Sequence, residues 1–339
     1  MRQLFSDDYF SARTRLLDAC QKADLTVQTL LHPSITDQRG EVAIDVVRIG
    51  SETASKVIFI SSGVHGTEGT VGSGVQLGLI EQLGQLRVSQ DVAYVIIHAV
   101  NPVGYINLTR CNEDNIDLNR NFKDFRAPLM ANPDYDSLRD ALCSNYLDGD
   151  KRAVDDQKIQ QYIDDHSMAA LTEKVLKGQH SDAQGIFYGG ICPSWSRLMI
   201  EQIVHQHAQH AQHVAIIDVH TGIGPRGVGL ILRDKVRDSQ QGDMAPLAGV
   251  MCTVLDQLAA HQSKIKIILE FGTLSFDQVL CSLRDDNWLY RHPDASLAQR
   301  NTIKHHLKHA LRVDEDDWYA AIWQQSWQLL IDVEAEMGS

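Results

Sequence analysis

A histidine and a glutamate three residues apart are the first side chains in this sequence whose types and spacing suit a chemical role. His65 and Glu68 lie in a glycine-containing segment, residues 62–69, which follows a run of apolar residues and precedes a helical pattern. An imidazole nitrogen and a carboxylate oxygen at this spacing can meet one cation at about 2.0–2.2 Å. The pair can equally be a turn histidine and a glutamate near a helix N-terminus, so a metal site requires further ligands.

His220 is the third candidate ligand. It ends a second apolar run, residues 214–220, and a glycine-containing turn follows it, so its place relative to its strand matches that of His65. Asp218 can orient this imidazole by a hydrogen bond to the ring nitrogen that does not bind the metal, or it can be a core aspartate that caps a loop. His65, Glu68 and His220 together predict a catalytic zinc site, because such a site keeps three protein ligands and leaves one position open for water.

Glu270 is the candidate general base. It is the single carboxylate at the end of an otherwise apolar run, residues 264–271. An unpaired buried charge is costly, so a carboxylate in this position is expected to be either paired or functional. Partial desolvation would raise its pKa toward neutral pH, which suits a group that takes a proton from water and later returns it.

Two arginines and an asparagine between the metal segments are candidates for substrate contacts. Arg110 can polarise a carbonyl and stabilise an oxyanion, whereas Asn119 and Arg120 can hold a substrate carboxylate through directed hydrogen bonds. The alternative is a loop that is cross-linked by salt bridges. Arg226, six residues after His220, is a further candidate for the edge of the pocket.

The elements that must position these side chains predict an α/β fold. Valine- and isoleucine-rich runs predict strands at residues 42–49, 56–61, 92–100, 214–220 and 264–271. Helical patterns at 70–86 and 245–260 connect successive strands, so the sheet is expected to be mainly parallel and covered on both faces. Open sheets of this kind bind ligands at the carboxyl ends of their strands, which is where the candidate residues lie.

The chain is predicted to form a single domain over residues 1–339. A helix is expected at residues 8–23, a helical insertion at about 123–190 and C-terminal helices at about 294–336. The tryptophan-bearing last segment is expected to pack on the domain itself, and a role in a homo-oligomer interface stays open.

Composition excludes several classes of function. The formal net charge of −13 argues against a nucleic-acid partner. The absence of a long apolar run and of a signal-like N-terminus favours a cytoplasmic protein without a membrane partner. Six cysteines lie scattered without a C-x-x-C pair, so reduced thiols are expected. The histidines at 205–213 and 305–309 are predicted to lie on solvated helix faces.

Four motifs occur in a characteristic order: His65-x-x-Glu68, Arg110 with residues 117–122, Asp218-x-His220-Thr221-Gly222 and Glu270-Phe271-Gly272-Thr273. In this order they resemble the signature of the zinc carboxypeptidase superfamily, which also holds succinylglutamate desuccinylase and aspartoacylase. The stretch 178–190, with Gly185-Ile186-Phe187-Tyr188-Gly189-Gly190, resembles a bacterial branch of uncharacterised carboxypeptidase-like proteins. The resemblance covers about residues 42–273.

This resemblance implies a mixed, mainly parallel sheet covered by helices on both faces, and one zinc ion on His65, Glu68 and His220. It further implies carbonyl polarisation by Arg110, carboxylate recognition by Asn119 and Arg120, and Glu270 as the base. The family's late pocket tyrosine has no clear counterpart, and Tyr188 is the proposed substitute.

The predicted function is zinc-dependent hydrolysis of an amide that lies near a carboxylate. A peptide C-terminus and an N-acyl amino acid both fit, so carboxypeptidase and deacylase activity stay open. One alternative is a zinc-dependent binding protein without catalysis. Another is a two-metal, aminopeptidase-like enzyme in which Asp117 or Asp218 bridges the metals.

Overall fold

The protein is described here by a computed structural model that covers residues 1–83, 89–129, 131–233 and 249–338. Within these residues, seven strands form one mixed sheet in the order β1-β2-β4-β3-β5-β7-β6. Its strands are β1 (Val27–Leu31), β2 (Ala43–Gly50), β3 (Lys56–Ser62), β4 (Val92–His98), β5 (His213–Arg226), β6 (Gly229–Arg233) and β7 (Ser263–Gly272). The inner strands β4, β3, β5 and β7 run parallel, and the outer strands pair antiparallel. The predicted α/β class with a mixed, mainly parallel sheet is confirmed.

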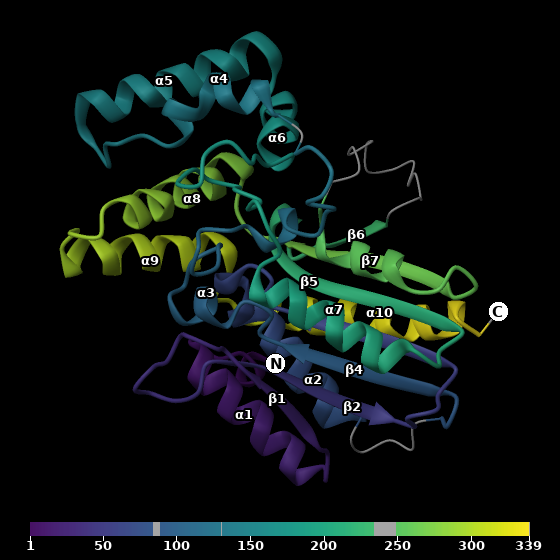
Figure 1. Cartoon of the computed structure of the whole chain (residues 1–339). Helices are drawn as coiled ribbons and strands as arrows, with labels where there is room; N and C mark the ends of the chain where they lie inside the picture. The colour runs from purple at the N-terminus through teal and green to yellow at the C-terminus, as the bar shows by residue number, and fades with distance from the viewer. Residues whose placement is uncertain (84–88, 130, 234–248, 339) are drawn as a thin grey trace.

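Helices cover both faces of this sheet (Figure 1). One face packs against α1 (Tyr9–Lys22), α2 (Gly69–Leu83) and α10 (Asp316–Glu336), and the other packs against α7 (Trp195–Ala208) and the 3-10 helix η4 (Met251–Gln257). Alternate residues of each strand serve the two faces: Ile58 and Ile60 belong to the first apolar cluster, and Val57 and Phe59 to the second. This period of two is the strand geometry that a doubly covered sheet requires.

The predicted insertion forms a third layer beyond the edge of the sheet. Its helices α4 (Pro133–Leu142), α5 (Gly149–His166) and α6 (Met168–Leu176) share an apolar cluster with α8 (Phe276–Arg291) and α9 (Leu297–Leu311). In Figure 1 these five helices stand together at one end of the molecule. The insertion therefore packs on helices that come much later in the chain.

Several element predictions were wrong in detail. The edge strands β1 and β6 were missed because each has only five residues with partial burial, and α8 precedes the helices that were expected from residue 294. The predicted helix at 245–260 is a 3-10 helix over Met251–Gln257 in its described part, and residues 245–248 lie outside the described residues. The predicted helix at 70–86 is observed as Gly69–Leu83, and residues 84–86 are likewise outside.

In the described part of the chain, no helix combines the length and apolar character needed to cross a membrane.

Candidate metal centre

The candidate ligands come together where the parallel strands end. His65 follows β3 and leads into the short 3-10 helix η2 (Gly66–Glu68), so its side chain and that of Glu68 leave the same turn. His220 lies on β5 directly beside Glu270 of β7 in the strand register. Because β3, β5 and β7 are parallel neighbours, their carboxyl ends share one edge of the sheet. Three segments far apart in sequence therefore place their polar groups in one site.

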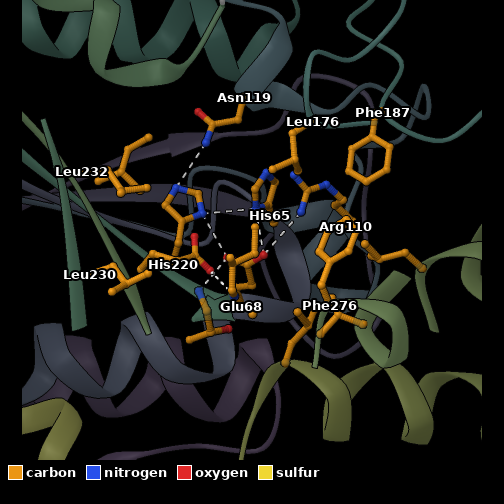
Figure 2. Close-up of a pocket in the computed structure, with 18 of the residues that line it drawn as sticks. His65, Glu68, Arg110, Asn119, Leu176, Phe187, His220, Leu230, Leu232 and Phe276 are labelled. Carbon is orange, nitrogen blue, oxygen red and sulfur yellow. Dashed lines mark hydrogen bonds and ion pairs between the residues drawn. The ribbon is translucent and has the colours of Figure 1, made fainter. Parts of the chain in front are cut away.

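Three candidate ligand side chains converge at this edge, all of them buried (Figure 2). His65 Nδ1 lies 2.8 Å from Glu68 Oε1, and His220 Nδ1 lies 3.0 Å from Glu68 Oε2. The two Nδ1 atoms are 3.2 Å apart. Each histidine thus turns the same ring nitrogen toward the glutamate, and this is the one group of three metal-ligand side chains found among the described residues.

The other ring nitrogen of each histidine faces a buried aspartate. His220 Nε2 lies 2.6 Å from Asp218 Oδ2, and His65 Nε2 lies 3.3 Å from Asp117 Oδ1. An aspartate in this position holds the proton on Nε2, which leaves Nδ1 with a free lone pair for a metal. Asp218 therefore contacts His220 in the manner that the sequence suggested.

The electrostatics of the three ligands suit a bound cation. Burial by itself would raise the pKa of Glu68, but His65 and His220 outweigh it and hold the pKa well below the usual range. Burial likewise opposes the charged form of His220, but Asp218 and Glu68 raise the pKa of this imidazole. Glu68 is thus an anion, and Asp218 increases the basicity of His220, which would share its metal.

The spacing of the donor atoms passes a simple test for zinc. With ligands at about 2.0–2.1 Å in tetrahedral geometry, neighbouring ligand atoms lie about 3.3 Å apart. The observed separations of 2.8, 3.0 and 3.2 Å are slightly shorter than this. Two imidazoles and one carboxylate are also a ligand set that zinc accepts in catalytic sites. The residues fit the metal with only small adjustments.

Glu270 lies next to the ligands as a partly buried carboxylate with a shifted pKa. Its Oε1 accepts a hydrogen bond of 3.0 Å from the Ile223 amide. Burial and the negative charge of Glu68 together raise the pKa of Glu270 to about 7, against the opposing effect of His220. A carboxyl group with this pKa can both accept and return a proton near neutral pH.

Arg110 borders the site on the side opposite to β6 (Figure 2). Its Nε donates a hydrogen bond of 2.9 Å to Asp117 Oδ2, and Nη1 lies 3.7 Å from Glu68 Oε1. Asp117 therefore links Arg110 to His65. Burial would raise the pKa of Asp117, but Arg110, Arg120 and His65 hold it well below its usual range.

Asn119 and Arg120 also line the pocket. The Asn119 amide is held by the Met251 N–H, which donates to its Oδ1 at 2.8 Å, and its Nδ2 lies 3.3 Å from His220 Nε2. Arg120 is only 2 % exposed, and its Nη1 donates to the Asn119 carbonyl at 2.6 Å. Its Nε has no hydrogen-bond partner in the part of the chain that the structure describes. A buried guanidinium with an unused donor is well suited to bind an anion.

The remainder of the pocket wall is apolar. The cavity has a volume of about 60 Å³. In Figure 2, Leu230 and Leu232 of β6 lie on one side of the His–Glu–His group, and Leu176, Phe187 and Phe276 lie on the other. The further apolar lining residues are Ile223, Ile268, Val279, Leu283 and Leu311.

Most of this chain matches the model of one protein family. A model described as "Protein of unknown function (DUF2817)" matches residues 5–245 and 233–325. The chain belongs to this family. No curated protein matches this DUF2817 chain.

Solved structures with similar folds include enzymes of the superfamily that the motifs resemble. Carboxypeptidase A from Helicoverpa armigera is 11% identical, with 91% of this chain and 75% of that chain covered and a TM-score of 0.44. Succinylglutamate desuccinylase from Chromobacterium violaceum is 12% identical, with 89% and 74% covered and a TM-score of 0.38. Thrombin activatable fibrinolysis inhibitor is 13% identical, with 89% and 74% covered and a TM-score of 0.45. Identities this low concern the fold and not the activity.

Two predicted pocket residues of the DUF2817 chain lie elsewhere. Tyr188 packs into the apolar cluster beneath α7, and its neighbour Phe187 lines the pocket instead, because the chain turns at this point. Arg226 lies beyond the pocket with a side chain that is 40% exposed, and it forms ion pairs with Glu315 and Asp317. Neither Tyr188 nor Arg226 lines the cavity described above.

Asp117 and Phe187 are the residues of the site whose roles the sequence reasoning missed. Asp117 was considered only as a bridge between two metals, whereas the structure places it behind His65 and beside Arg110. Phe187 stood in a recognised motif without an assigned role. The available signal was the position of Asp117 two residues before Asn119, at the end of the loop that carries Arg110.

Proposed function

We propose that this protein is a zinc-dependent amide hydrolase of the metallocarboxypeptidase type, which acts on a peptide C-terminus or an N-acyl amino acid. The observation that carries the proposal is the meeting of His65 Nδ1, His220 Nδ1 and the Glu68 carboxylate beside Glu270 on the adjacent strand. This arrangement provides a metal site and a separate carboxylate whose raised pKa suits a general base.

The residues divide the work of hydrolysis among them. A zinc ion on the three ligands would act as a Lewis acid that makes water more acidic and the substrate carbonyl more electrophilic. Glu270 takes the proton from the attacking water and passes it to the leaving nitrogen. Arg110 donates hydrogen bonds to the carbonyl oxygen as negative charge develops there. Asp117 keeps the guanidinium of Arg110 in place through its bond to Nε.

A carboxylate on the substrate would bind Arg120 and Asn119. Arg120 has an unused Nε donor in a buried position, where an ion pair is weakened little by water. The bonds of Asn119 to Met251 and of Arg120 to Asn119 hold both side chains before a ligand arrives. Such preorganisation lowers the entropic cost of binding.

The apolar walls favour a small substrate with apolar groups on either side of the amide. A charged substrate side chain among Leu230, Leu232 and Phe276 would lose its hydration without gaining a partner. The insertion contributes Leu176 and Phe187 to this apolar wall. These features favour dipeptides and N-acyl amino acids over the end of a folded protein.

The geometry favours one metal ion over two. Asp117 and Asp218 face the Nε2 atoms of the histidines, on the far side of the rings from the converging Nδ1 atoms. They therefore support the ligands and are not placed to bridge a second ion beside the first. The raised pKa of Glu270 favours catalysis over binding alone, because it suits a group that accepts and returns a proton.

The test is metal analysis followed by hydrolysis of a panel of dipeptides and N-acyl amino acids by zinc-loaded protein. We expect one zinc per chain and turnover of apolar members of the panel. Glu270→Gln should keep the zinc and lose nearly all turnover, whereas His220→Ala should lose the zinc. Tight ligand binding without turnover would favour the binding protein, and full activity of Glu270→Gln would exclude the proposed base.

A further inference from the structure

The loop between α6 and α7 brings an aromatic ring against the arginine of the site. Phe187 is 1% exposed, and its ring centroid lies 5.0 Å from Arg110 Cζ, close enough for a cation–π contact. The Nε of the same guanidinium is bound by Asp117. Figure 2 shows Phe187 beside Arg110 at the margin of the pocket. Arg110 is thus held by an ion pair and by an aromatic face.

Phe187 occupies this position at a conformational cost. Its φ is +56°, in the left-handed region that bulky residues rarely adopt. A residue persists in such a conformation only where its surroundings over-determine it, and such residues occur preferentially at functional sites.

The surroundings of Phe187 fix the loop on both sides. The backbone N–H of Gln179 donates to the Phe187 carbonyl at 3.0 Å, and the Asn115 side chain donates to the Gly185 carbonyl at 2.9 Å. The Asp117 amide donates to the Tyr188 carbonyl at 2.7 Å. Asp117 therefore holds Arg110 with its side chain and the backbone next to Phe187 with its amide. Asp117 is thus hydrogen-bonded both to the Arg110 guanidinium and to the backbone segment that carries the Phe187 ring.

We propose that Phe187 is a positioning residue that keeps Arg110 directed at the substrate carbonyl. Arg110 lies between two carboxylates, since Nη1 is 3.7 Å from Glu68. Without the ring, the guanidinium can tilt toward Glu68, a candidate metal ligand. Its N–H groups would then no longer point toward the substrate carbonyl. The ring opposes this tilt while leaving the Nη hydrogens free to donate. This role rests on the proposed function.

A double-mutant cycle tests the proposal. Phe187→Leu keeps an apolar pocket wall but removes the π face, and we expect kcat to fall about tenfold with little change in KM. In an Arg110→Ala background, Phe187→Leu should cost less than about twofold. Phe10→Leu is the matched control, because Arg39 lies 4.7 Å over the Phe10 ring away from the site, and it should leave kcat unchanged. An equal loss in both backgrounds, or no loss in either, would overturn the proposal.

A second measurement does not depend on catalysis. The Arg110 Nε–H signal in nitrogen-15 NMR, assigned by its absence in Arg110→Lys, should be shifted by the ring current of Phe187 and should move in Phe187→Leu. Phe187→Gly should melt at a higher temperature than Phe187→Ala, against the usual order, because only glycine adopts positive φ freely. Unchanged NMR shifts would refute the contact even if wild-type protein showed no hydrolysis, whereas a shift without any hydrolysis would refute only the proposed function.

Discussion

Replacing Asp218 with asparagine tests whether the carboxylate behind His220 contributes to metal binding. Asp218 is fully buried, with Oδ2 2.6 Å from His220 Nε2, and its Oδ1 accepts a hydrogen bond of 2.7 Å from Ser61. Asparagine has almost the same shape but no charge. It can keep an oxygen toward His220 only by turning its amide nitrogen toward the Ser61 hydroxyl, which can accept that bond. Asp218→Asn therefore removes charge while leaving the packing intact.

The magnitude follows from the change in hydrogen-bond strength. A hydrogen bond to a charged group contributes about 1.5–3 kcal/mol and a neutral one about 0.5–1.5 kcal/mol. The midpoints of these ranges differ by about 1.2 kcal/mol, which corresponds to a nearly tenfold change in an equilibrium constant. We therefore expect zinc affinity to fall about tenfold, at the lower end of the range usual for partners of metal-bound histidines.

The assay is competition for zinc against a chelator of known affinity, with Asp45→Asn as the matched control. Asp45 is equally buried and lies 4.0 Å from another buried histidine, His98, but contacts no candidate ligand. Asp45→Asn should lower the melting temperature and leave zinc affinity unchanged. If Asp218→Asn bound zinc as tightly as the wild type, or if both variants lost affinity equally, the assigned role of Asp218 would be wrong.

Three further outcomes are expected. The value of kcat/KM should fall as the pH drops through the pKa of Glu270, because the protonated carboxyl cannot accept a proton. Burial and Glu68 raise this pKa to about 7 without metal, whereas a bound cation lowers it. The fall in kcat/KM on the acid side should therefore lie at or below pH 7. A pH profile that is flat from 5 to 8 would argue against this base. Leu232→Ala shortens a side chain of the apolar wall and so enlarges the pocket. It should raise the preference for bulky over small apolar substrates about tenfold, measured as kcat/KM for substrates in competition. An unchanged preference would place the substrate away from β6. Arg226→Ala should leave kcat/KM unchanged in the same assays, because this side chain pairs with Glu315 and Asp317 outside the pocket, and a large loss would return Arg226 to the site.

Much of the fold was predictable because it depends on local patterns. Continuous apolar runs predict strands that are covered on both faces, and the inner strands β3, β4, β5 and β7 were recognised in this way. The short outer strands β1 and β6 lack such a pattern, since each contacts the sheet on one side only. Their pairing partners are distant in sequence or depend on the sheet already being formed, so local composition could not identify them.

Candidate residues were predicted best where a strand end determined their location. His65, His220 and Glu270 each follow or end a central parallel strand, and strands of this kind bring their carboxyl ends to one edge. Tyr188 lies in an irregular segment, and Arg226 ends β5 beyond a shift in its register with β7, so spacing along the chain does not determine the direction of either side chain. Their positions outside the cavity lining could not be read from the sequence for this reason.

The sequence alone determined the α/β class, the identity of the residues that can bind a metal and the separate carboxylate suited to act as a base. Only the tertiary structure decided which nitrogen of each histidine faces Glu68, that Asp117 connects His65 with Arg110, and that the insertion places Phe187 beside that arginine. The physical reason is that strand and turn patterns act over a few residues, whereas hydrogen bonds and ring contacts between distant segments form only when the sheet and its covering helices have brought those segments together.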